Sequence, residues 1–301
     1  MRVLITGGSG FVGQRLCRRL KEAGHRLLVV SREPDKVRDR LPEGSDIRRS
    51  VLDFVDTPPD AIVNLAGESI AGRRWSEEQK ERLIDSRVNI TGDLVTLCEQ
   101  LQSTQGRTPK VMVSASAMGY YGDQGDREVT EQTPPHDEFA HRLCKRWEDA
   151  ASAAEKFGVR VALLRIGLVL DAGGGSLKKM LPPFKMGLGG RFGDGKQFMP
   201  WIHREDLVSA ILFLLERPDL EGPFNGSAPH PVTNAEFTRI LAKQLGRPAL
   251  MPMPAIALET AFGEMSRLLL TGADMRPARL LEAGFEFRFP TLDKALAAIL
   301  G

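Results

Sequence analysis

Cysteine and tyrosine are scarce in this 301-residue chain. The three cysteines, Cys17, Cys98 and Cys144, show neither CxxC nor metal-ligand spacing, so we expect no metal site, and their odd number suits a reducing compartment. No window approaches the about 18 uninterrupted apolar residues of a membrane-spanning helix. The first apolar run, Val3 to Ile5, is too short for a signal peptide. The sequence therefore predicts no membrane partner and a cytoplasmic location.

An excess of charge of one sign is also missing. The chain has 41 Lys and Arg against 39 Asp and Glu, a formal net charge of +2. This balance does not demand nucleic acid as a partner, whereas a nucleotide or another small anion would suffice. With 42% apolar and 27% charged residues the chain is globular. Its length suits one large α/β domain or two smaller ones, and it gives no indication of oligomeric state.

What the sequence does contain is a glycine-rich turn at its N-terminus. A short strand around Val3–Ile5 is followed by glycines, then a helical pattern from Phe11, then a second strand at residues 27–30. This order predicts a dinucleotide-binding turn. Gly7 would allow the tight turn, Gly10 the approach of a pyrophosphate, and Gly13 the close packing of helix on strand. The alternative is an ordinary turn that happens to use glycine.

The residues after the second strand bear on the choice of cofactor. NAD sites usually place Asp or Glu here to bind the ribose 2′-hydroxyl, but this strand ends Ser31-Arg32. A guanidinium can hold a 2′-phosphate that a carboxylate would repel. We therefore predict NADP(H). The alternative is that Arg32 is a solvated surface residue, and Glu33, one position further, is the main counter-argument.

Further candidate residues follow the other expected strands, at residues 47–53, 61–67 and 111–113. Ligands of open α/β sheets bind at the carboxyl ends of the strands. Asp53 would lie near an adenine amino group, with a simple turn residue as the alternative. Ala66 and Gly67 are small, so they would leave room for a cofactor to pass across the end of the strand at residues 61–67. The strand at residues 111–113 leads into the hydroxyl-rich, aromatic turn of residues 114–122, which is a candidate functional site. The alternative is that Ser and Gly occur in this turn for steric reasons.

The remaining pattern alternates helices and strands, with one interruption. A helix capped by Ser76 either breaks near Asn89 or runs on toward Leu101. The other expected elements are helices at 139–157, 204–215, 234–245 (capped by Thr233 with Glu236), 255–270, 277–283 and 291–300, and strands at 159–164 and 222–227. Residues 171–201 are basic and rich in Gly and Pro, which indicates either a mobile substrate-covering region or a plain surface insertion.

Several motifs together resemble the extended short-chain dehydrogenase/reductase superfamily, and in particular its atypical sugar-nucleotide-epimerase-like branch, over nearly the whole chain. They are GxxGxxG at residues 7–13, NLAGE at 64–68, RWSEEQKERL at 74–83, SASAMGYYGD at 114–123, GLGG at 187–190, WIHREDL at 201–207 and a small C-terminal helical region. The resemblance implies a Rossmann-type, doubly wound parallel sheet and NADP(H) binding. The candidate cofactor-binding residues are Gly7, Ser9, Gly10, Phe11, Val12, Gly13, Ser31, Arg32, Asp53, Leu65, Ala66, Gly67, Glu68 and Arg165.

The same resemblance implies two domains. The NADP-binding domain would span residues 1–170, with 201–226 returning to it. A smaller substrate domain would be assembled from 171–200 and 227–301. Its substrate would be a small molecule, with sugar nucleotides and other anions among the candidates.

One departure from the superfamily limits what can be inferred about chemistry. Its reactive pair is Tyr-x-x-x-Lys on the helix after the Ser-rich strand, where the lysine lowers the tyrosine pKa. Here that helix places Ala140 and Cys144 at the two positions, and a shift by one residue gives Phe139 and Leu143. No register of this helix supplies a tyrosine, because the chain has only two, in the preceding turn.

Three interpretations remain open. In the first, Ser116 binds the substrate oxygen and Tyr120 or Tyr121 supplies the proton for hydride transfer at an oxygen-bearing carbon, with His141 or Lys145 assisting. In the second, Cys144 is a nucleophile or redox thiol, against the alternative of a small buried residue. In the third, the protein senses NADP(H) or binds a partner with a vestigial active site. Arg165 and His203 are expected near the cleft, with structural hydrogen bonding as their alternative role.

Overall fold

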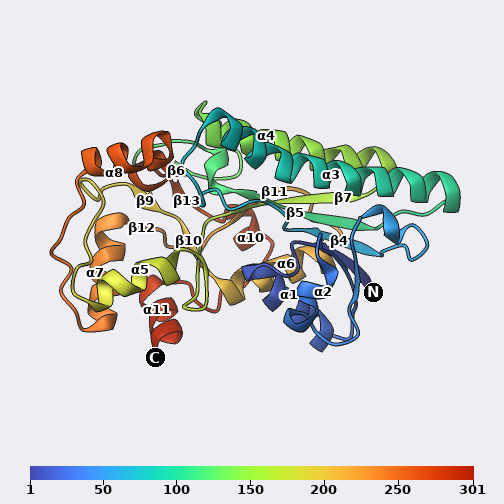
Figure 1. Ribbon diagram of the computed structural model, residues 1–301, viewed down its shortest axis with the longest axis horizontal. Helices are drawn as coiled ribbons and strands as arrows, with labels where there is room; N and C mark the ends of the chain where they lie inside the picture. Colours follow the sequence, from blue (N-terminus) through green and yellow to red (C-terminus); the bar gives the residue numbers. More distant parts are fainter.

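A seven-stranded parallel sheet forms the centre of the computed structural model, which describes residues 1–301 (Figure 1). Its strand order is β11-β7-β5-β4-β1-β2-β3, and every neighbouring pair is parallel. The strands are β1 (Arg2–Thr6), β2 (Arg26–Val30), β3 (Asp46–Arg48), β4 (Ala61–Asn64), β5 (Val111–Ala117), β7 (Arg160–Ile166) and β11 (Gly222–Gly226). The chain starts in the middle and winds outward in both directions, so the order reverses between β1 and β4, as expected for a doubly wound Rossmann-type sheet.

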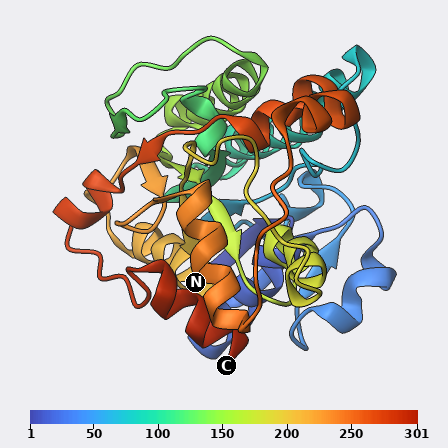
Figure 2. The same ribbon diagram turned by 90° about the vertical axis from the view of Figure 1, so that its left-hand side faces the viewer.

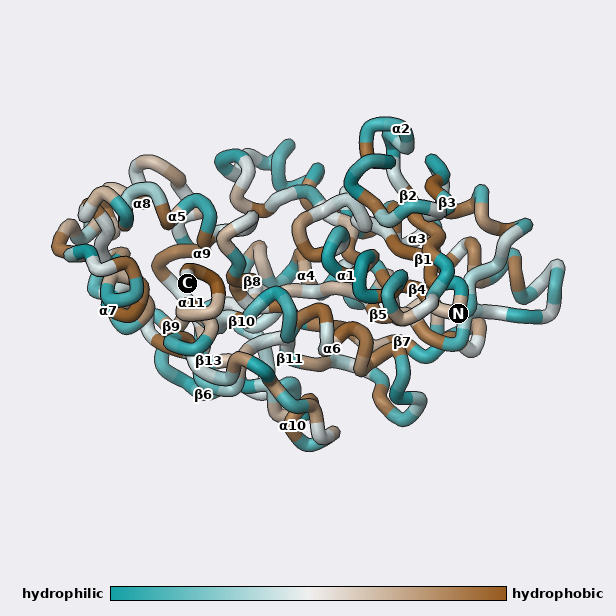
Figure 3. The backbone as a smooth tube through the Cα atoms, turned by 90° about the horizontal axis from the view of Figure 1, so that it is seen from below, coloured by the Kyte–Doolittle hydropathy of each residue, from teal (hydrophilic) through white to brown (hydrophobic).

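Helices cover both faces of this sheet, which is why its strands are apolar on both sides. In β1, Val3 and Ile5 pack in one cluster with α1 (Phe11–Glu22) and α6 (Arg204–Glu216), while Leu4 packs in the other with α3 (Glu77–Gln105). The helix α4 (Phe139–Ser152) lies beside α3 (Figure 1). In Figure 3 the hydrophobic stretches accordingly run through the middle of the molecule, along the sheet and α6.

A smaller region lies beyond the carboxyl ends of the strands (Figures 1 and 2), and it contains a third, smaller cluster of buried side chains. This cluster joins Leu177 of one helix to Phe237 and Leu296 of two others around Trp201. The elements of this region are α5 (Gly175–Lys185), α7 (Asn234–Leu245), α8 (Ala255–Phe262), α9 (Arg267–Leu270), α11 (Leu292–Leu300), β8 (Leu168–Leu170), β9 (Phe198–Met199), β10 (Trp201–His203) and β12 (Val232–Thr233). Two-stranded pairings of β10 with β8 and of β12 with β9 connect them.

The C-terminal part also returns to the large sheet. β13 (Asp274–Met275) pairs with β6 (Glu128–Val129), and α10 (Ala278–Glu282) packs on β11. Leu280 and Phe285 belong to the hydrophobic cluster of the sheet itself. The short remaining elements are α2 (Pro34–Val37) and the 3-10 turns η1 (Arg38–Arg40), η2 (Leu52–Phe54), η3 (Met118–Tyr120), η4 (Ala153–Phe157) and η5 (Gly263–Ser266). The domain boundaries expected from sequence stay a prediction.

Several elements differ from the sequence-based expectations. β3 ends at Arg48, well before residue 53, and β5 extends four residues beyond Val113 to Ala117. α3 does not break near Asn89 but continues to Gln105. Residues 139–157 form α4 followed by a 3-10 turn, and residues 255–270 are divided into two helices by a 3-10 turn. No helix of the molecule has the length and apolarity needed to cross a bilayer.

The largest difference is α5, a helix inside the Gly- and Pro-rich stretch that looked irregular. It holds Pro182 and Pro183 in its C-terminal half. Leu177, Leu181 and Phe184 are buried on one face at spacings of four and three residues, and they pack in the smaller hydrophobic cluster. Burial of this apolar stripe outweighs the local preference of the glycines and prolines for irregular backbone.

The capping box at the start of α7 provides a test of the local stability of this region. The Thr233 side chain accepts a bond from the Glu236 N–H, and the Glu236 carboxylate accepts one from the Thr233 N–H. Thr233→Ala should lower the free energy of unfolding by about 1 kcal/mol, the usual value of an N-cap, in urea titrations followed by circular dichroism. Thr260→Ala is the control, because its hydroxyl bonds only the Ile256 carbonyl within α8. Equal losses in both variants would contradict the role of the cap.

Candidate functional site

The glycine-rich turn between β1 and α1 has the geometry of an anion cradle. Gly7 has a φ of +69°, and a side chain on Gly13 would overlap the Gly7 carbonyl. Gly10 is the N-cap residue of α1, and no side chain caps the helix. The N–H groups of the first turn are therefore left for an anion, which the helix dipole also favours. Ser9, Phe11 and Val12 lie in the same turn, as expected.

The turn after β4 lies directly against this cradle. A Cβ atom built on Gly7 would be 2.6 Å from the Leu65 carbonyl oxygen, so the two turns approach as closely as glycine permits. The Ala66 N–H donates to the Thr6 hydroxyl at 3.3 Å, and that hydroxyl donates to Asn64 at 2.6 Å. The structure thus brings together the two segments, residues 7–13 and 65–68, that the sequence placed in one site.

Side chains of α3 hold the second turn in place, and sequence reasoning had missed them. Arg87 donates to the Glu68 carbonyl at 2.8 Å, and Gln79 donates to the Glu68 carboxylate at 2.9 Å. Thr91 accepts a bond from the Asn64 amide at 2.8 Å. Gln79 therefore reaches Glu68 rather than completing a capping box with Ser76. No sequence signal connects these residues, because the contacts depend on how α3 packs.

The end of β2 presents an unpaired arginine. Arg32 is exposed and makes no ion pair, whereas Glu33 is paired with Lys36. Lys36 is the main reason why the pKa of Glu33 lies below its usual range, and Arg32 and Arg49 contribute to the lowering. The counter-argument from sequence is thereby weakened, since the carboxylate is already engaged. Arg49 is a second cation near this point that sequence reasoning did not single out.

The prediction that a strand ends at Asp53 is wrong, because β3 already ends at Arg48. Asp53 lies in η2, and its carboxylate accepts a bond from the Ser50 N–H at 3.0 Å. Arg48, at the true end of β3, donates to the Asp53 carbonyl. This is the turn geometry named as the alternative, and the adenine contact stays a prediction.

A buried polar network occupies the place where catalytic hydroxyls were expected. Ser116 donates to Glu148 at 2.6 Å, and Arg165 forms a two-pronged ion pair with the same carboxylate at 2.9 Å for each bond. Arg165 also donates to the Tyr121 hydroxyl at 3.0 Å, which donates to Asn225 at 2.7 Å. All five side chains are buried.

Ser116, Tyr121 and Arg165 are therefore turned toward one another and toward Glu148 and Asn225, and their roles at a substrate stay predictions. Each uses its polar atoms inside the protein, and burial raises the pKa of Tyr121 to about 12, the opposite of what a general acid at neutral pH needs. His203 is likewise structural, since its ring caps α6 by accepting from the Glu205 N–H. No sequence motif around Glu148 predicts this ion pair, because its partner Arg165 belongs to another element, the strand β7.

Tyr120 is the candidate hydroxyl that stays half-buried. The Arg165 guanidinium lies over its ring, 3.3 Å from the ring centre, and His141 packs edge-on against it. His141 Nδ1 lies 2.7 Å from the Tyr120 carbonyl oxygen, so it positions this turn. Lys145 is paired with Asp149 on the surface, and this carboxylate is the main cause of the raised pKa of Lys145, to which Tyr120 also contributes.

Cys144 has the surroundings of a structural residue rather than of a nucleophile. Its side chain is buried, and desolvation raises the pKa of its thiol to about 12. A thiol with this pKa is protonated at neutral pH, so it is a poor nucleophile. The alternative named for it, a small residue packed on the helix, describes what the structure shows.

We expect Cys144 to be unreactive in the folded protein. In Cys17→Ser/Cys98→Ser protein, thiol alkylation by iodoacetamide at pH 8 should be at least about 100-fold slower than in urea-unfolded protein, because both access and thiolate formation are lost. Mass spectrometry of the labelled cysteine measures the rate. The reaction of the unfolded sample serves as the control. Labelling of the folded protein at the unfolded rate would restore Cys144 as a candidate nucleophile.

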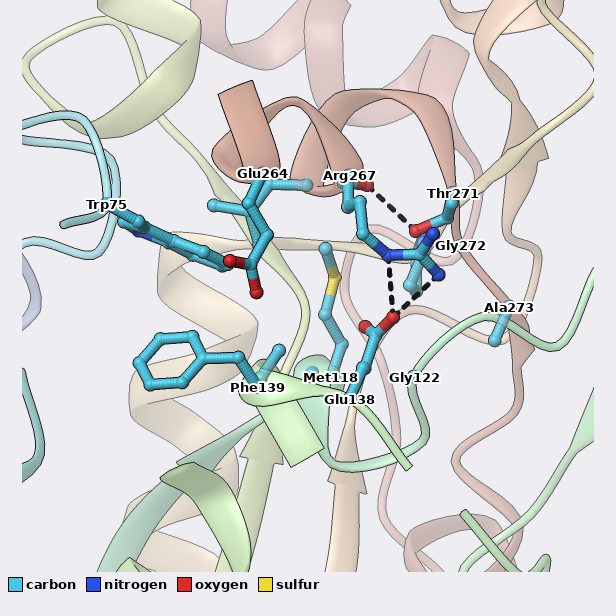
Figure 4. Close-up of a pocket in the computed structure, with 14 residues that line it drawn as sticks. Trp75, Met118, Gly122, Glu138, Phe139, Glu264, Arg267, Thr271, Gly272 and Ala273 are labelled. Atoms are coloured by element: carbon cyan, nitrogen blue, oxygen red, sulfur yellow. Dashed lines mark hydrogen bonds and ion pairs between the residues drawn. The ribbon is translucent and has the colours of Figure 1, made fainter. Parts of the chain in front are cut away.

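A pocket opens next to Ala140, the position of the missing tyrosine (Figure 4). It lies between the turn after β5, the start of α4 and the segment 264–273. Gly119 packs against Ala140, with an added Cβ atom only 3.1 Å from the alanine methyl. The lining residues are Trp75, Met118, Gly119, Gly122, Glu138, Phe139, Ala140, Pro200, Glu264, Arg267, Leu268, Thr271, Gly272 and Ala273. The segment 264–273 had not been singled out from sequence.

No three His, Cys, Asp or Glu side chains gather where they could hold a metal ion. The parallel doubly wound sheet, the glycine cradle at its switch point and the pocket at the same sheet edge define a Rossmann-type dinucleotide-binding protein.

Comparison with known proteins shows to which family within this class the chain belongs. The model of the NAD dependent epimerase/dehydratase family matches residues 3–225, and a domain of unknown function (DUF1731) matches residues 253–299. The chain belongs to this epimerase/dehydratase family. An epimerase family protein of Mycobacterium tuberculosis, MT2273, is 39% identical over 298 residues, which cover 98% of this chain and 96% of the relative.

Solved structures agree with this assignment. Human epimerase family protein SDR39U1 is 38% identical over 304 residues, which cover all of both chains. Its crystal structure (isoform 2) with NADPH matches at a TM-score of 0.87 and 35% identity, over 99% of each chain. UDP-glucose 4-epimerase of Thermus thermophilus with NAD matches at a TM-score of 0.77 and 20% identity, over 99% of this chain and 97% of the other. The last match bears on the fold alone.

Proposed function

We propose that this protein is an NADP(H)-dependent oxidoreductase that transfers hydride at an oxygen-bearing carbon of a small molecule. The observation that carries the proposal is the pocket beside Gly119 and Ala140. It opens at the carboxyl end of β5, the same sheet edge at which the cradle of residues 7–13 lies. A dinucleotide held by that cradle extends along this edge, so its reactive end and a substrate in the pocket can meet.

The choice of NADP(H) rests on this chain's own residues and on its relative. Arg32 is exposed and unpaired at the end of β2, while Glu33 is taken up by Lys36. A free guanidinium suits a 2′-phosphate. The related human protein was crystallised with NADPH. We extend this cofactor to the present protein. The cytoplasmic location stays a prediction from the sequence alone.

The proton chemistry must differ from that of the Tyr-Lys enzymes. Bound NADP(H) would supply or accept the hydride. Of the candidate hydroxyls, Ser116 and Tyr121 are committed to the buried network, which leaves Tyr120 or water as the proton donor. Phe139 and Ala140 line the pocket with carbon surface, which would limit the number of water molecules near the reacting carbon.

The alternative, an NADP(H)-sensing protein without catalysis, is favoured by one observation. Ser116, Arg165 and Tyr121, which occupy the strand ends near the expected reaction site, stabilise the fold instead of facing the pocket. Such a protein would bind NADPH and change its contacts with a partner without consuming it.

Deuteride transfer separates the two candidates. NADPH deuterated on either face at C4 is incubated with the protein and a panel of aldehydes and ketones. Mass spectrometry should then find deuterium in an alcohol product from one face only. A Gly13→Val variant, in which the added side chain overlaps the Gly7 carbonyl, is the control without cofactor. Tight NADPH binding without transfer to any compound of the panel would favour the sensor.

A further inference from the structure

The walls of the pocket are mainly apolar. Trp75 and Phe139 form an aromatic corner with their ring centres 4.8 Å apart (Figure 4). Met118, Leu268 and Ala273 also line the pocket. Apolar and aromatic walls of this kind bind ligands by burying carbon surface. A ligand here would be oriented by the shape of the aromatic corner more than by hydrogen bonds.

The polar side chains of the pocket are already engaged with one another or with their neighbours. Arg267 is paired with Glu138 at 2.7 Å, and its Nε donates to the same carboxylate at 2.9 Å (Figure 4). Glu264 is paired with Lys80 of α3 at 2.6 Å. The Thr271 hydroxyl donates to the Arg267 carbonyl within its own helix at 2.8 Å. Each of these side chains therefore already has a partner within the protein.

The charge balance of the lining also opposes an anion. Two carboxylates, Glu138 and Glu264, line the pocket, and the cations beside them are Arg267 and Lys80, each already paired with one of these carboxylates. A third carboxylate, Asp123, lies 3.8 Å from the Arg267 guanidinium. An anionic substrate would have to displace Glu138 from Arg267 and leave that carboxylate unpaired while it is mostly buried, which is costly.

We propose that the pocket takes an uncharged carbonyl compound with an apolar ring or branched chain, and that Glu138 excludes anionic substrates by neutralising Arg267. This inference rests on the proposed function only in taking the pocket as the substrate site. It separates this protein from sugar-nucleotide enzymes, because a nucleoside diphosphate would bring two phosphates to a lining with no unpaired cation. Glu138 is then a specificity-determining residue.

Two matched probes test the inference without turnover. 4-Methylbenzaldehyde and 4-carboxybenzaldehyde share one ring and differ in a methyl group against a carboxylate. Their binding to the NADP⁺-loaded protein is measured by isothermal titration calorimetry, with UDP-glucose as a third probe. The unchanged protein should bind the methyl compound at least about 10-fold more tightly than the carboxylate, and UDP-glucose should not bind in the pocket.

Glu138→Gln is the decisive variant, because it frees Arg267 and keeps the shape of the side chain. Affinity for the carboxylate probe should rise at least about 10-fold, while affinity for the methyl probe changes less than about 3-fold. Glu78→Gln is the matched control. It also releases an arginine, Arg82, but on the exposed face of α3.

Leu268→Trp should fill the pocket and remove binding of the methyl probe, and NADP⁺ binding shows whether each variant is folded. Should Leu268→Trp fail to fold, Trp75→Ala removes one aromatic wall and should weaken the methyl probe about 5-fold.

The results that overturn the inference are distinct from failure of the proposed function. Equal binding of both benzaldehydes, binding of neither, tight UDP-glucose binding that Leu268→Trp abolishes, or no effect of Glu138→Gln would each overturn it. Selective binding of the methyl compound with no deuteride transfer to any carbonyl compound would support the inference and contradict the oxidoreductase.

Discussion

Replacing Glu148 with alanine is expected to lower the free energy of unfolding by about 3–5 kcal/mol, the usual effect of removing one partner of a buried ion pair. The Arg165 side chain is 4% exposed and that of Glu148 7%, so the arginine would be left charged and buried without its carboxylate. Ser116 would lose its acceptor in the same step. Urea unfolding followed by circular dichroism measures the loss.

Two further variants make this prediction specific. Asp149→Ala removes the neighbouring carboxylate of α4, which forms an exposed pair with Lys145, and should cost less than about 1 kcal/mol. Glu148→Leu/Arg165→Met removes both charges and should recover part of the stability, because it leaves neither charge alone. A loss in Glu148→Ala no greater than in Asp149→Ala would show that the network does not stabilise the fold.

Replacing Arg32 with alanine is expected to weaken NADPH binding by about 1.5–3 kcal/mol, roughly a 10- to 150-fold rise in Kd, and to leave NADH binding almost unchanged. The physical reason is that a guanidinium forms charge-assisted bonds to a 2′-phosphate, which NADH lacks. Titration of nicotinamide fluorescence for both cofactors gives the two constants.

Arg38 offers the matched control for this experiment. It is also an exposed arginine after β2, but it is paired with Asp35. Arg38→Ala should therefore change neither constant by more than about 2-fold. Equal weakening of NADPH and NADH in Arg32→Ala would mean that the arginine acts on the shared part of the cofactor, and would contradict the assignment to the 2′-phosphate.

The cofactor cradle could be predicted from sequence because its determinants are local. Gly7, Gly10 and Gly13 are needed by a turn and a helix start that residues 1–30 form among themselves. Long-range polar contacts carry no such signal. Ser116 and Tyr121 look like catalytic hydroxyls in a linear motif, and only the positions of Glu148 and Asn225 show that they are internal hydrogen-bonding groups.

The pocket, too, could be predicted only in part from the sequence. The missing tyrosine at Ala140 could be recognised in the sequence, but not the segment 264–273 that closes the space beside it. That segment reaches the pocket through the ion pair of Arg267 with Glu138 and the pairing of β13 with β6. Residues more than 120 positions apart meet there, and helix or strand periodicity is silent on such contacts.

The pairing of β6 with β13 has a consequence for the order of assembly during translation. The turns at residues 7–13 and 65–68 leave the ribosome long before residues 264–275, so the cofactor cradle can be complete while one side of the pocket is still unmade. A nascent chain arrested after residue 230 is thus expected to lack the pocket, and synthesis through residue 275 supplies the segment that completes it. We therefore expect the cofactor cradle to form first and the pocket second.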